Sequence, residues 1–491
     1  MAKQRPLDSN GKPKFGMTDK LAYAAGDFGC NMSFSLKGTI QTFWVAFMML
    51  ETGLLSALLL VVQIWDAIND PLIGSLIDSD RRQYRMGKFK TYIFIGAIGL
   101  LVAGSLCFIP VPKAHVVIKA ILFIVGYVIW DAFYTVANVP YGSMLSLVTE
   151  DPGERAQLST WRSVGSMIGN MLPMVLLPML IWRGVVDENG KEVINPETGV
   201  QQEVLLGNRV FFVAILMGVL GFLAFLFMLK KITLRVDESS VKVNEGEKFN
   251  ILAAFGNFMR NRPAIGATLA AMAMFLGMNS ATTATTIMFA IYFGKASLSG
   301  IASLVGFLPM LFFMPFIKKI VAKWGKKEAS AVGSLVSVGG GVLMFIFPLI
   351  ENRDLALVMY ILALCIFGIG MGIYTCVSWA LMADAIDYNE WKTGRREEGT
   401  VYSLRSFFRK LAQGIGPSIV LLLMGALGYV SDLGTGGQSA ATASNMCWLV
   451  AGLYLFSAVL QFVSIAFIYN LDKKTTATMM AELAERNEAA K

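Results

Sequence analysis

Two aspartates and an asparagine lie at helical spacing in an apolar stretch early in the chain. Asp66, Asn69 and Asp70 are spaced i, i+3 and i+4, so one helix face would carry two carboxylates and an amide. Like charges on adjacent turns repel unless a cation or a proton relieves them. Hard oxygen ligands suit Na⁺ or Li⁺, and a shared proton would serve as well. We therefore predict a site for a monovalent cation or proton; alternatively, the acids pair with Lys37 and Arg162 only to hold helices together.

A second apolar stretch offers a matching polar face. Asp131, Thr135 and Asn138 follow one another at i, i+4 and i+7. The Thr135 hydroxyl can add an oxygen to the cation site, and the Asn138 amide can hydrogen-bond a sugar hydroxyl. The alternatives are an interhelical hydrogen bond for Asn138 and an ion pair with Lys37 for Asp131. We predict that Thr135 binds the cation and that Asn138 binds the substrate.

Further polar residues have the types found in sugar sites. Tyr23, Asp27 and Asn31 succeed one another at one helical turn each, and an aromatic ring beside amide and carboxylate oxygens is typical of a sugar site. Arg162 can hold a carboxylate of the protein or of a substrate, and Lys392 is expected to reach the same cavity. The alternatives are helix packing for the first three and a solvated loop for Lys392. We predict that these five side chains line the substrate site.

The elements that must position these residues are membrane helices. Of the 491 residues, 55% are hydrophobic and only 15% are charged, well below the quarter that is usual in soluble domains. A single histidine, His115, excludes histidine triads and paired-histidine metal or haem sites. Five widely spaced cysteines predict no disulfide framework, and the polar first twenty residues predict no cleaved signal peptide. We therefore expect no cofactor apart from a coupling ion.

The apolar runs predict an all-α membrane protein with twelve transmembrane helices. About 20 apolar residues are enough to cross the hydrocarbon core of a bilayer as a helix. We place the helices at 21–50, 53–77, 91–111, 116–149, 156–182, 210–233, 263–294, 296–317, 328–350, 355–388, 400–431 and 443–471.

Lysine and arginine are distributed unevenly between the segments that join these helices. If both ends of the chain are cytoplasmic, the inside segments hold 33 of these residues and the outside segments hold 7. Cytoplasmic loops collect positive charge, so we predict a multi-pass protein of the cell membrane with both termini in the cytoplasm. The net charge of +8 then reflects topology, and we expect the lipid bilayer as a partner and no nucleic acid.

A long polar stretch after the sixth helix divides the chain into two halves. Short motifs of the first half recur in the second at offsets of 238 and 243 residues, as in transporters built by parallel duplication. We expect an N-terminal cytoplasmic tail, a six-helix bundle, a cytoplasmic linker, a second six-helix bundle and a C-terminal cytoplasmic tail at 1–20, 21–233, 234–262, 263–471 and 472–491.

The chain resembles the glycoside–pentoside–hexuronide:cation symporters, the melibiose-carrier branch of the major facilitator superfamily. The resemblance lies in Trp65-Asp-Ala-Ile-Asn-Asp-Pro71, Gly87-Lys-Phe-Lys90, Asn138-Val-Pro-Tyr-Gly-Ser143 and Asp387-Tyr-Asn-Glu-Trp-Lys-Thr-Gly394. It implies the superfamily fold of two six-helix halves. It also implies that cation ligands of the family correspond to Asp66, Asn69, Asp70 and Thr135, and positions of the sugar cavity to Asn31, Asn138, Arg162 and Lys392.

Several positions depart from the melibiose carriers. Cys30 and Asn31 stand where those carriers have Lys-Asp, and Asn138 replaces an acid that serves both sugar and cation. Gly142 and Thr375 replace tryptophans of the sugar pocket. The resemblance therefore favours the glucuronide, xyloside and related branches over galactoside carriers.

Together, these observations predict a secondary active transporter that imports a sugar or glycoside with Na⁺, Li⁺ or H⁺ by alternating access. Two bases, Arg162 and Lys392, favour an anionic sugar such as a glucuronide, and a neutral glycoside or pentoside stays open. The alternatives are an uncoupled sugar facilitator and a lysolipid carrier of the same superfamily. A membrane-embedded enzyme is disfavoured because the chain lacks a catalytic histidine or nucleophile motif. We expect a monomer in the bacterial inner membrane.

Overall fold

The computed structural model describes residues 13–80, 82–236, 251–394 and 398–489. These residues are almost entirely helical, and the strands among them form one two-stranded sheet, β1–β2. The chain divides into two compact units. The first unit comprises Met1–Arg183 and Val204–Glu245, and the second comprises Gly184–Glu203 and Gly246–Lys491.

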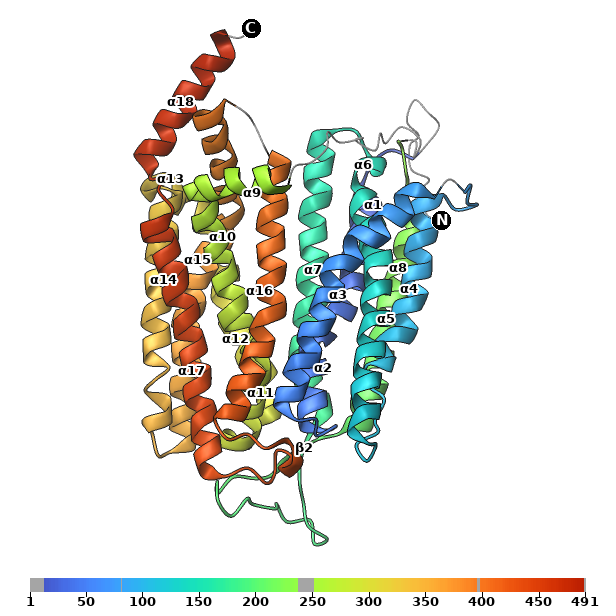
Figure 1. Ribbon diagram of the computed structural model, residues 1–491, viewed down its shortest axis with the longest axis vertical. Coiled ribbons are helices and arrows are strands. Elements are labelled where there is room, and N and C mark those ends of the chain that lie inside the picture. Colours follow the sequence, from blue (N-terminus) through green and yellow to red (C-terminus); the bar gives the residue numbers. More distant parts are fainter. Residues whose placement is uncertain (1–12, 81, 237–250, 395–397, 490–491) are drawn as a thin grey trace. The chain divides into compact units, whose positions relative to one another are not determined.

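The first unit is a bundle of long helices that lie side by side (Figure 1). Its helices are α1 Met17–Phe34, α2 Leu36–Ala46, α3 Thr52–Ser79, α4 Lys88–Leu106, α5 Val116–Ser143, α6 Leu145–Val148, α7 Pro152–Ile181 and α8 Gly207–Lys231. Strands β1 Trp182–Gly184 and β2 Glu203–Leu205 pair where α7 ends and α8 begins.

The second unit is also helical, and several of its helices change type along their length. Its α-helices are α9 Ile251–Arg260, α10 Arg262–Met274, α11 Thr282–Met288, α12 Ser299–Phe313, α13 Ile317–Trp324, α14 Lys326–Leu343, α15 Arg353–Thr393, α16 Glu398–Ala426, α17 Ala440–Val463 and α18 Lys473–Ala489. Short π-helical and 3₁₀ segments join them at η2 Phe275–Asn279, η3 Phe289–Phe293, η4 Ala296–Leu298, η5 Met314–Phe316, η6 Phe347–Leu349, η7 Ser431–Leu433 and η8 Ser464–Ile468. Much of the expected linker, residues 237–250, lies outside the described residues.

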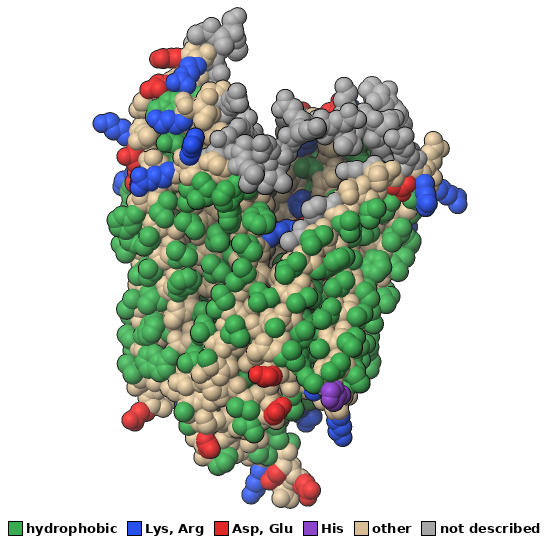
Figure 2. Space-filling view, viewed as in Figure 1, with side chains coloured by type: hydrophobic (Ala, Val, Ile, Leu, Met, Phe, Trp, Pro, Cys, Tyr) green, Lys and Arg blue, Asp and Glu red, His purple; other side chains and the backbone are tan. Residues whose placement is uncertain are grey.

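Among the described residues, ten helical stretches are long and apolar enough to cross a membrane. The expected count of twelve is therefore not confirmed. The first expected span is broken at Ser35 into α1 and α2, and the span expected at 296–317 contains the 15-residue α12 followed by a 3₁₀ turn. Hydrophobic side chains cover the middle of each unit on the face in Figure 2, and charged side chains gather at the ends. This distribution fits helices that lie in lipid.

Glycine allows α1 and α7 to approach closely. A Cβ atom on Gly165 would collide with the backbone carbonyl of Ala24, and one on Gly169 would lie 2.9 Å from Cβ of Asn31. Neither position can therefore carry a side chain unless the neighbouring atoms shift. The two helices can therefore pack backbone to backbone, which brings polar residues of α1 and α7 within hydrogen-bonding distance.

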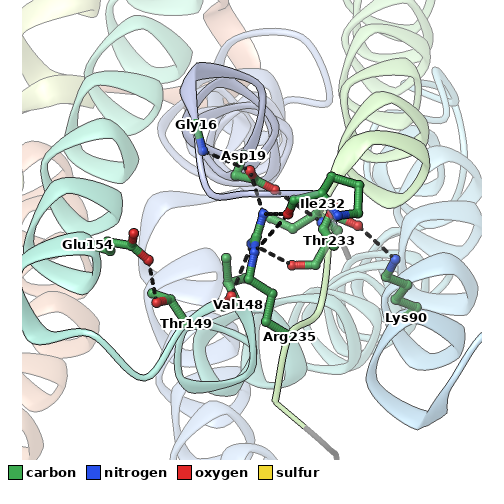
Figure 3. A network of polar contacts seen from close by, with 10 residues as sticks. Gly16, Asp19, Lys90, Val148, Thr149, Glu154, Ile232, Thr233 and Arg235 are labelled. Atoms are coloured by element: carbon green, nitrogen blue, oxygen red, sulfur yellow. Dashed lines mark hydrogen bonds and ion pairs between the residues drawn. The ribbon is translucent and has the colours of Figure 1, made fainter. Parts of the chain in front are cut away.

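At one end of the first unit, a buried carboxylate ties the start of α1 to the chain that follows α8 (Figure 3). Asp19 is fully buried. Its Oδ2 accepts hydrogen bonds from the backbone N–H of Gly16 at 3.1 Å and from Nη2 of Arg235 at 3.0 Å, and its Oδ1 accepts one from the N–H of Thr233 at 3.2 Å. The carboxylate thus has a donor at each oxygen.

Arg235 satisfies its guanidinium group at the same place. Nε and Nη2 donate to the carbonyl of Pro13 at 3.1 and 2.8 Å, and Nη1 donates to the carbonyls of Val148 and Thr233, both at 3.1 Å. Nη2 also donates to Asp19. This ion pair and its backbone contacts therefore join three segments of the first unit, around Asp19, Val148 and Arg235.

The segment Gly184–Glu203 connects two helices of the first unit but packs into the second unit. Nδ2 of Asn195 donates to the carbonyls of Gly436 and Gln438 at 2.9 and 3.1 Å, and Oγ1 of Thr435 donates to the carbonyl of Glu203. The Glu203 carboxylate accepts a hydrogen bond from the N–H of Ala296. Burial raises the pKa of Glu203 to about 7, against the lowering effect of that hydrogen bond.

Candidate functional site

Asn69 is the centre of a polar cluster between α3 and α5. Its side chain is fully buried, and Nδ2 lies 3.0 Å from Oδ2 of Asp131, 3.2 Å from the Asp131 carbonyl and 2.9 Å from Oγ1 of Thr135. Its Oδ1 is buried and has no hydrogen-bond partner among the described residues. A buried carbonyl oxygen without a donor costs free energy unless another group, such as a cation, satisfies it.

Thr135 extends the cluster to one of the two predicted cation-binding aspartates. Its Oγ1 donates to Oδ1 of Asp70 at 2.8 Å while it accepts from Asn69. The hydroxyl is therefore oriented by a donor on one side and a carboxylate on the other. Asn69, Asp70 and Thr135, which were predicted from their spacing on two separate apolar stretches, lie together in the structure.

Asp66 is held from a different side. Its Oδ2 lies 3.8 Å from Nζ of Lys37, on α2, and the two side chains are 20% and 19% exposed. The predicted alternative, in which the acids pair with Lys37 and Arg162, therefore applies to Asp66 and Lys37 but not to Arg162. The pairing of Asp131 with Lys37, also considered from the sequence, is replaced by the hydrogen bonds between Asp131 and Asn69.

The cluster offers hard oxygen atoms of three kinds: carboxylate, amide and hydroxyl. Among the described residues, no group of three or more His, Cys, Asp or Glu side chains converges in a way that could hold a metal ion. A monovalent cation at this place would therefore combine the predicted pair, Asp66 and Asp70, with the neutral oxygens of Asn69 and Thr135.

A second polar cluster lies between α1 and α7. Nε of Arg162 lies 3.0 Å from Oδ1 of Asp27, and Nδ2 of Asn31 donates to Oδ2 of Asp27 at 3.1 Å. Asn170, two turns after Arg162, donates through Nδ2 to Oδ1 of Asn31 at 2.6 Å. The predicted substrate residues Asp27, Asn31 and Arg162 are thus brought into one hydrogen-bonded chain, and Arg162 remains 37% exposed.

Two tyrosines close one end of this cluster. The rings of Tyr23 and Tyr141 stack with centroids 4.7 Å apart, and each hydroxyl donates to the other residue's carbonyl, at 3.3 and 2.7 Å. The guanidinium of Arg162 lies 5.0 Å from the Tyr141 ring centroid. Tyr23 therefore has a rigid position beside Asp27 and Arg162, with a fully buried ring.

Two predicted substrate residues lie apart from these hydrogen bonds. Asn138 is partly buried on α5, and its side chain makes no hydrogen bond among the described residues. Lys392 is exposed at the end of α15 in the second unit, where its Nζ lies 3.9 Å from the Trp391 ring centroid. Asn138 is therefore not hydrogen-bonded to the cluster around Asp27, and Lys392 belongs to the other unit.

Sequence reasoning missed two residues of the clusters, Asn170 and Tyr141, and one contact, between Asn69 and Asp131. Asn170 follows Arg162 at i+8, which places both on one face of α7 and was a usable signal. Tyr141 lies inside the Asn138–Ser143 motif, but its stacking on Tyr23 depends on two helices distant in sequence. The contact between Asn69 and Asp131 carried a signal too, because Asp131 is one turn before Thr135.

Comparisons with known proteins identify the family and the fold. The family described as MFS/sugar transport protein matches residues 22–473. The chain is 29% identical to an uncharacterized symporter, YjmB, of Bacillus subtilis (strain 168), over 96% of both chains, and 26% identical to an isoprimeverose transporter of Lactiplantibacillus pentosus, over 96% of this chain and 92% of the other. The structure is similar to that of a D-xylose-proton symporter, with a TM-score of 0.61, 12% identity and coverage of 93% and 98%.

Proposed function

The chain belongs to the MFS/sugar transport protein family, and we propose that it imports a sugar or glycoside together with a monovalent cation by alternating access. It is a membrane transporter rather than an enzyme, as its family is, and the resemblance to the glycoside–pentoside–hexuronide:cation symporters is confirmed. The observation that carries the proposal of coupling is the oxygen-rich cluster around Asn69. A buried amide oxygen without a donor, beside two carboxylates within the membrane, is a place that a cation would stabilise.

Asp66, Asn69, Asp70 and Thr135 would bind Na⁺ or Li⁺, or an aspartate would take up H⁺. The two carboxylates repel each other when the site is empty, and a bound cation removes that repulsion. Lys37 can offset the charge of Asp66 in an empty site, but closure would still remove Asp70 from water without the coupling cation. The cation therefore makes the closed state accessible, which is how its gradient would drive sugar uptake.

The substrate would bind beside Asp27, Arg162, Asn31 and Tyr23. The carboxylate and amide oxygens would accept hydrogen bonds from sugar hydroxyls, and the guanidinium would donate to them, while the buried Tyr23 ring backs this surface. Because Asp27 already balances the charge of Arg162, a neutral sugar or glycoside fits this cluster at least as well as a glucuronide. Asn138 and Lys392 remain predicted substrate contacts.

Topology and assembly complete the proposal. We propose that both termini are cytoplasmic, in the bacterial inner membrane, and that the protein works as a monomer. A cysteine introduced at the exposed Asn189 should then react with a membrane-impermeant maleimide added to intact cells, whereas one introduced at Ala477 should react only after the cells are permeabilised. The opposite labelling pattern would reverse the orientation.

Uptake into vesicles tests the central claim. Tracer glycosides and uronides are offered with an inward gradient of Na⁺, Li⁺ or H⁺, and the substrate that accumulates is followed in Asp66→Asn and Asp70→Asn. Both variants should lose uphill accumulation. The matched control is Asp354→Asn, which removes an exposed carboxylate paired with Lys295 in the second unit and should accumulate substrate normally.

Other results would favour the alternatives. Uptake that equilibrates without any gradient, and that both variants retain, would identify an uncoupled facilitator. Uptake of a lysolipid in place of sugars would identify a lysolipid carrier. Either result would overturn cation-coupled sugar symport.

A further inference from the structure

Lys37 places a permanent positive charge beside the proposed cation site. It lies on α2, directly after the break at Ser35 that separates α2 from α1. Its Nζ lies 3.8 Å from Oδ2 of Asp66. An ammonium group at this distance attracts the same carboxylate that a mobile cation would bind.

The contact between Lys37 and Asp66 is longer than two other ion pairs of the first unit. Arg162–Asp27 and Arg235–Asp19 both measure 3.0 Å, and these pairs are closed by hydrogen bonds. At 3.8 Å the lysine and Asp66 attract each other without a hydrogen bond of normal length. The Asp66 carboxylate therefore keeps lone pairs that a smaller cation could use.

Two aromatic rings also stabilise the charge of Lys37. Its Nζ lies 5.8 Å from the ring centroids of both Phe34 and Tyr127, within the range of cation–π attraction. Nε2 of Gln63 donates to the Tyr127 hydroxyl at 3.2 Å and so fixes that ring. The flexible lysine can move away from Asp66 and keep a favourable environment for its charge.

We propose that Lys37 is a tethered competitor of the coupling cation, one that neutralises Asp66 when the site is empty and must be displaced before Na⁺ or Li⁺ binds. This inference rests on the proposed cation-coupled transport. Its consequence is weak binding of alkali cations, because each must replace a charge that the protein already supplies. Lys37 would thus set the affinity of the site for its cation.

Thermal unfolding of the purified carrier tests this inference without a known substrate. The melting temperature is measured against NaCl and LiCl, with choline chloride keeping the ionic strength constant, since a ligand that binds the folded state raises it. In Lys37→Met the half-saturating Na⁺ or Li⁺ concentration should fall by at least about tenfold, because the competing charge 3.8 Å from Asp66 has been removed. Lys37→Arg, which keeps the charge, should stay close to the unaltered protein.

Further variants separate competition from a structural role. Lys295→Met removes a lysine paired with Asp354, far along the chain, and should not change the cation response. Lys37→Gln serves as a second neutral variant if Lys37→Met does not fold. Adding Asp66→Asn to Lys37→Met or to Lys37→Gln should abolish the gain in cation affinity. A Lys37→Met protein that is less stable but has an unchanged half-saturating concentration, or that responds to neither cation, would overturn the inference.

The thermal assay, read together with the uptake assay, separates failure of the competitor role of Lys37 from failure of the proposed function. If Asp66→Asn and Asp70→Asn lose uphill uptake while Lys37→Met leaves cation affinity unchanged, coupling stands and the competitor role falls. If those aspartate variants keep uphill uptake, the proposed coupling itself falls.

Discussion

Two clusters in the first unit each surround a fully buried polar side chain, Asp19 in one and Asn69 in the other. At Asp19, both carboxylate oxygens have donors, and the partner Arg235 places its N–H groups on backbone carbonyls and on Asp19 (Figure 3). At Asn69, the amide nitrogen is fully used, but the amide oxygen has no donor among the described residues. Nearby, Asp66 and its lysine stand 3.8 Å apart.

The difference shows that a buried polar cluster can either stabilise the fold or bind a ligand. A cluster with every donor and acceptor satisfied stabilises one conformation, and removal of either ionic partner leaves the other uncompensated. A cluster with an unused oxygen and a loose ion pair has capacity for a ligand, at some cost in stability. We therefore propose that the Asp19 cluster stabilises the fold and that the Asn69 cluster binds the coupling cation.

We expect the largest effect when the Asp19 cluster loses its arginine. Arg235→Met leaves the Asp19 carboxylate buried without its cation, which should lower the free energy of unfolding by about 3–5 kcal/mol. Denaturant titration of the purified protein in detergent measures the loss. The cation half-saturating concentration of the folded fraction should not change; a shift would mean that the two clusters are not separate in role.

Glu203 is a buried carboxylate of the second unit that accepts one hydrogen bond, from the backbone N–H of Ala296. The pKa of Glu203 is raised to about 7, above its ordinary value of 4.5, so the folded state favours the protonated form. Its contribution to stability is therefore present at low pH and is lost as the pH rises from about 4.5 through 7. Between pH 5 and 8 we expect a loss on the order of 1–3 kcal/mol, measured as a falling melting temperature.

Glu203→Gln is the matched variant for this pH dependence. The amide cannot ionise, so its melting temperature should vary less between pH 5 and 8 than that of the unaltered protein. Equal pH profiles in the two proteins would show that Glu203 does not ionise in this range.

We expect a smaller effect, on cation affinity, when the Asn69 cluster loses the Thr135 hydroxyl oxygen. Thr135→Val keeps the shape of the side chain but removes the hydroxyl that joins Asn69 to Asp70. The half-saturating cation concentration should rise roughly tenfold, about 1.4 kcal/mol, in the thermal assay or in uptake. Thr135→Ser should restore it. If valine and serine behave alike, the hydroxyl is not a ligand.

The smallest effect concerns the two tyrosines beside Asp27. Tyr141→Phe keeps the stacked ring but removes the hydroxyl that donates to the Tyr23 carbonyl. One lost hydrogen bond should lower the free energy of unfolding by about 1 kcal/mol. A loss several times larger would place this pair with the closed Asp19 cluster rather than beside a substrate site.

The sequence predicted the helical class and much of the first-unit sites because helical spacing is a local property. Asp66, Asn69 and Asp70 share a face of α3 by spacing alone. What each side chain meets depends on the helix packed opposite: Asn69 meets α5, whereas Asp66 meets Lys37 on α2. The break at Ser35, which makes α2 a separate short helix, carried no strong sequence signal.

Contacts between distant segments were beyond the same reasoning. Asn195 binds carbonyls 241 and 243 residues away, and no spacing rule relates those positions. The short π-helical segments, such as Phe275–Asn279, likewise interrupt apolar runs that predict uniform helices. Hydrophobicity is the same in both helix types, so the composition of a run does not reveal the change.

The segment Gly184–Glu203 also offers a labelling site for following the second unit by fluorescence. Although α7 and α8 of the first unit flank it, it packs into the second unit, with junctions at 183–184 and 203–204. A fluorophore on Asn189 would therefore follow the second unit, despite being attached between two helices of the first. Paired with a second dye on the first unit, it would report the proposed alternating access as a change of distance in single-molecule fluorescence.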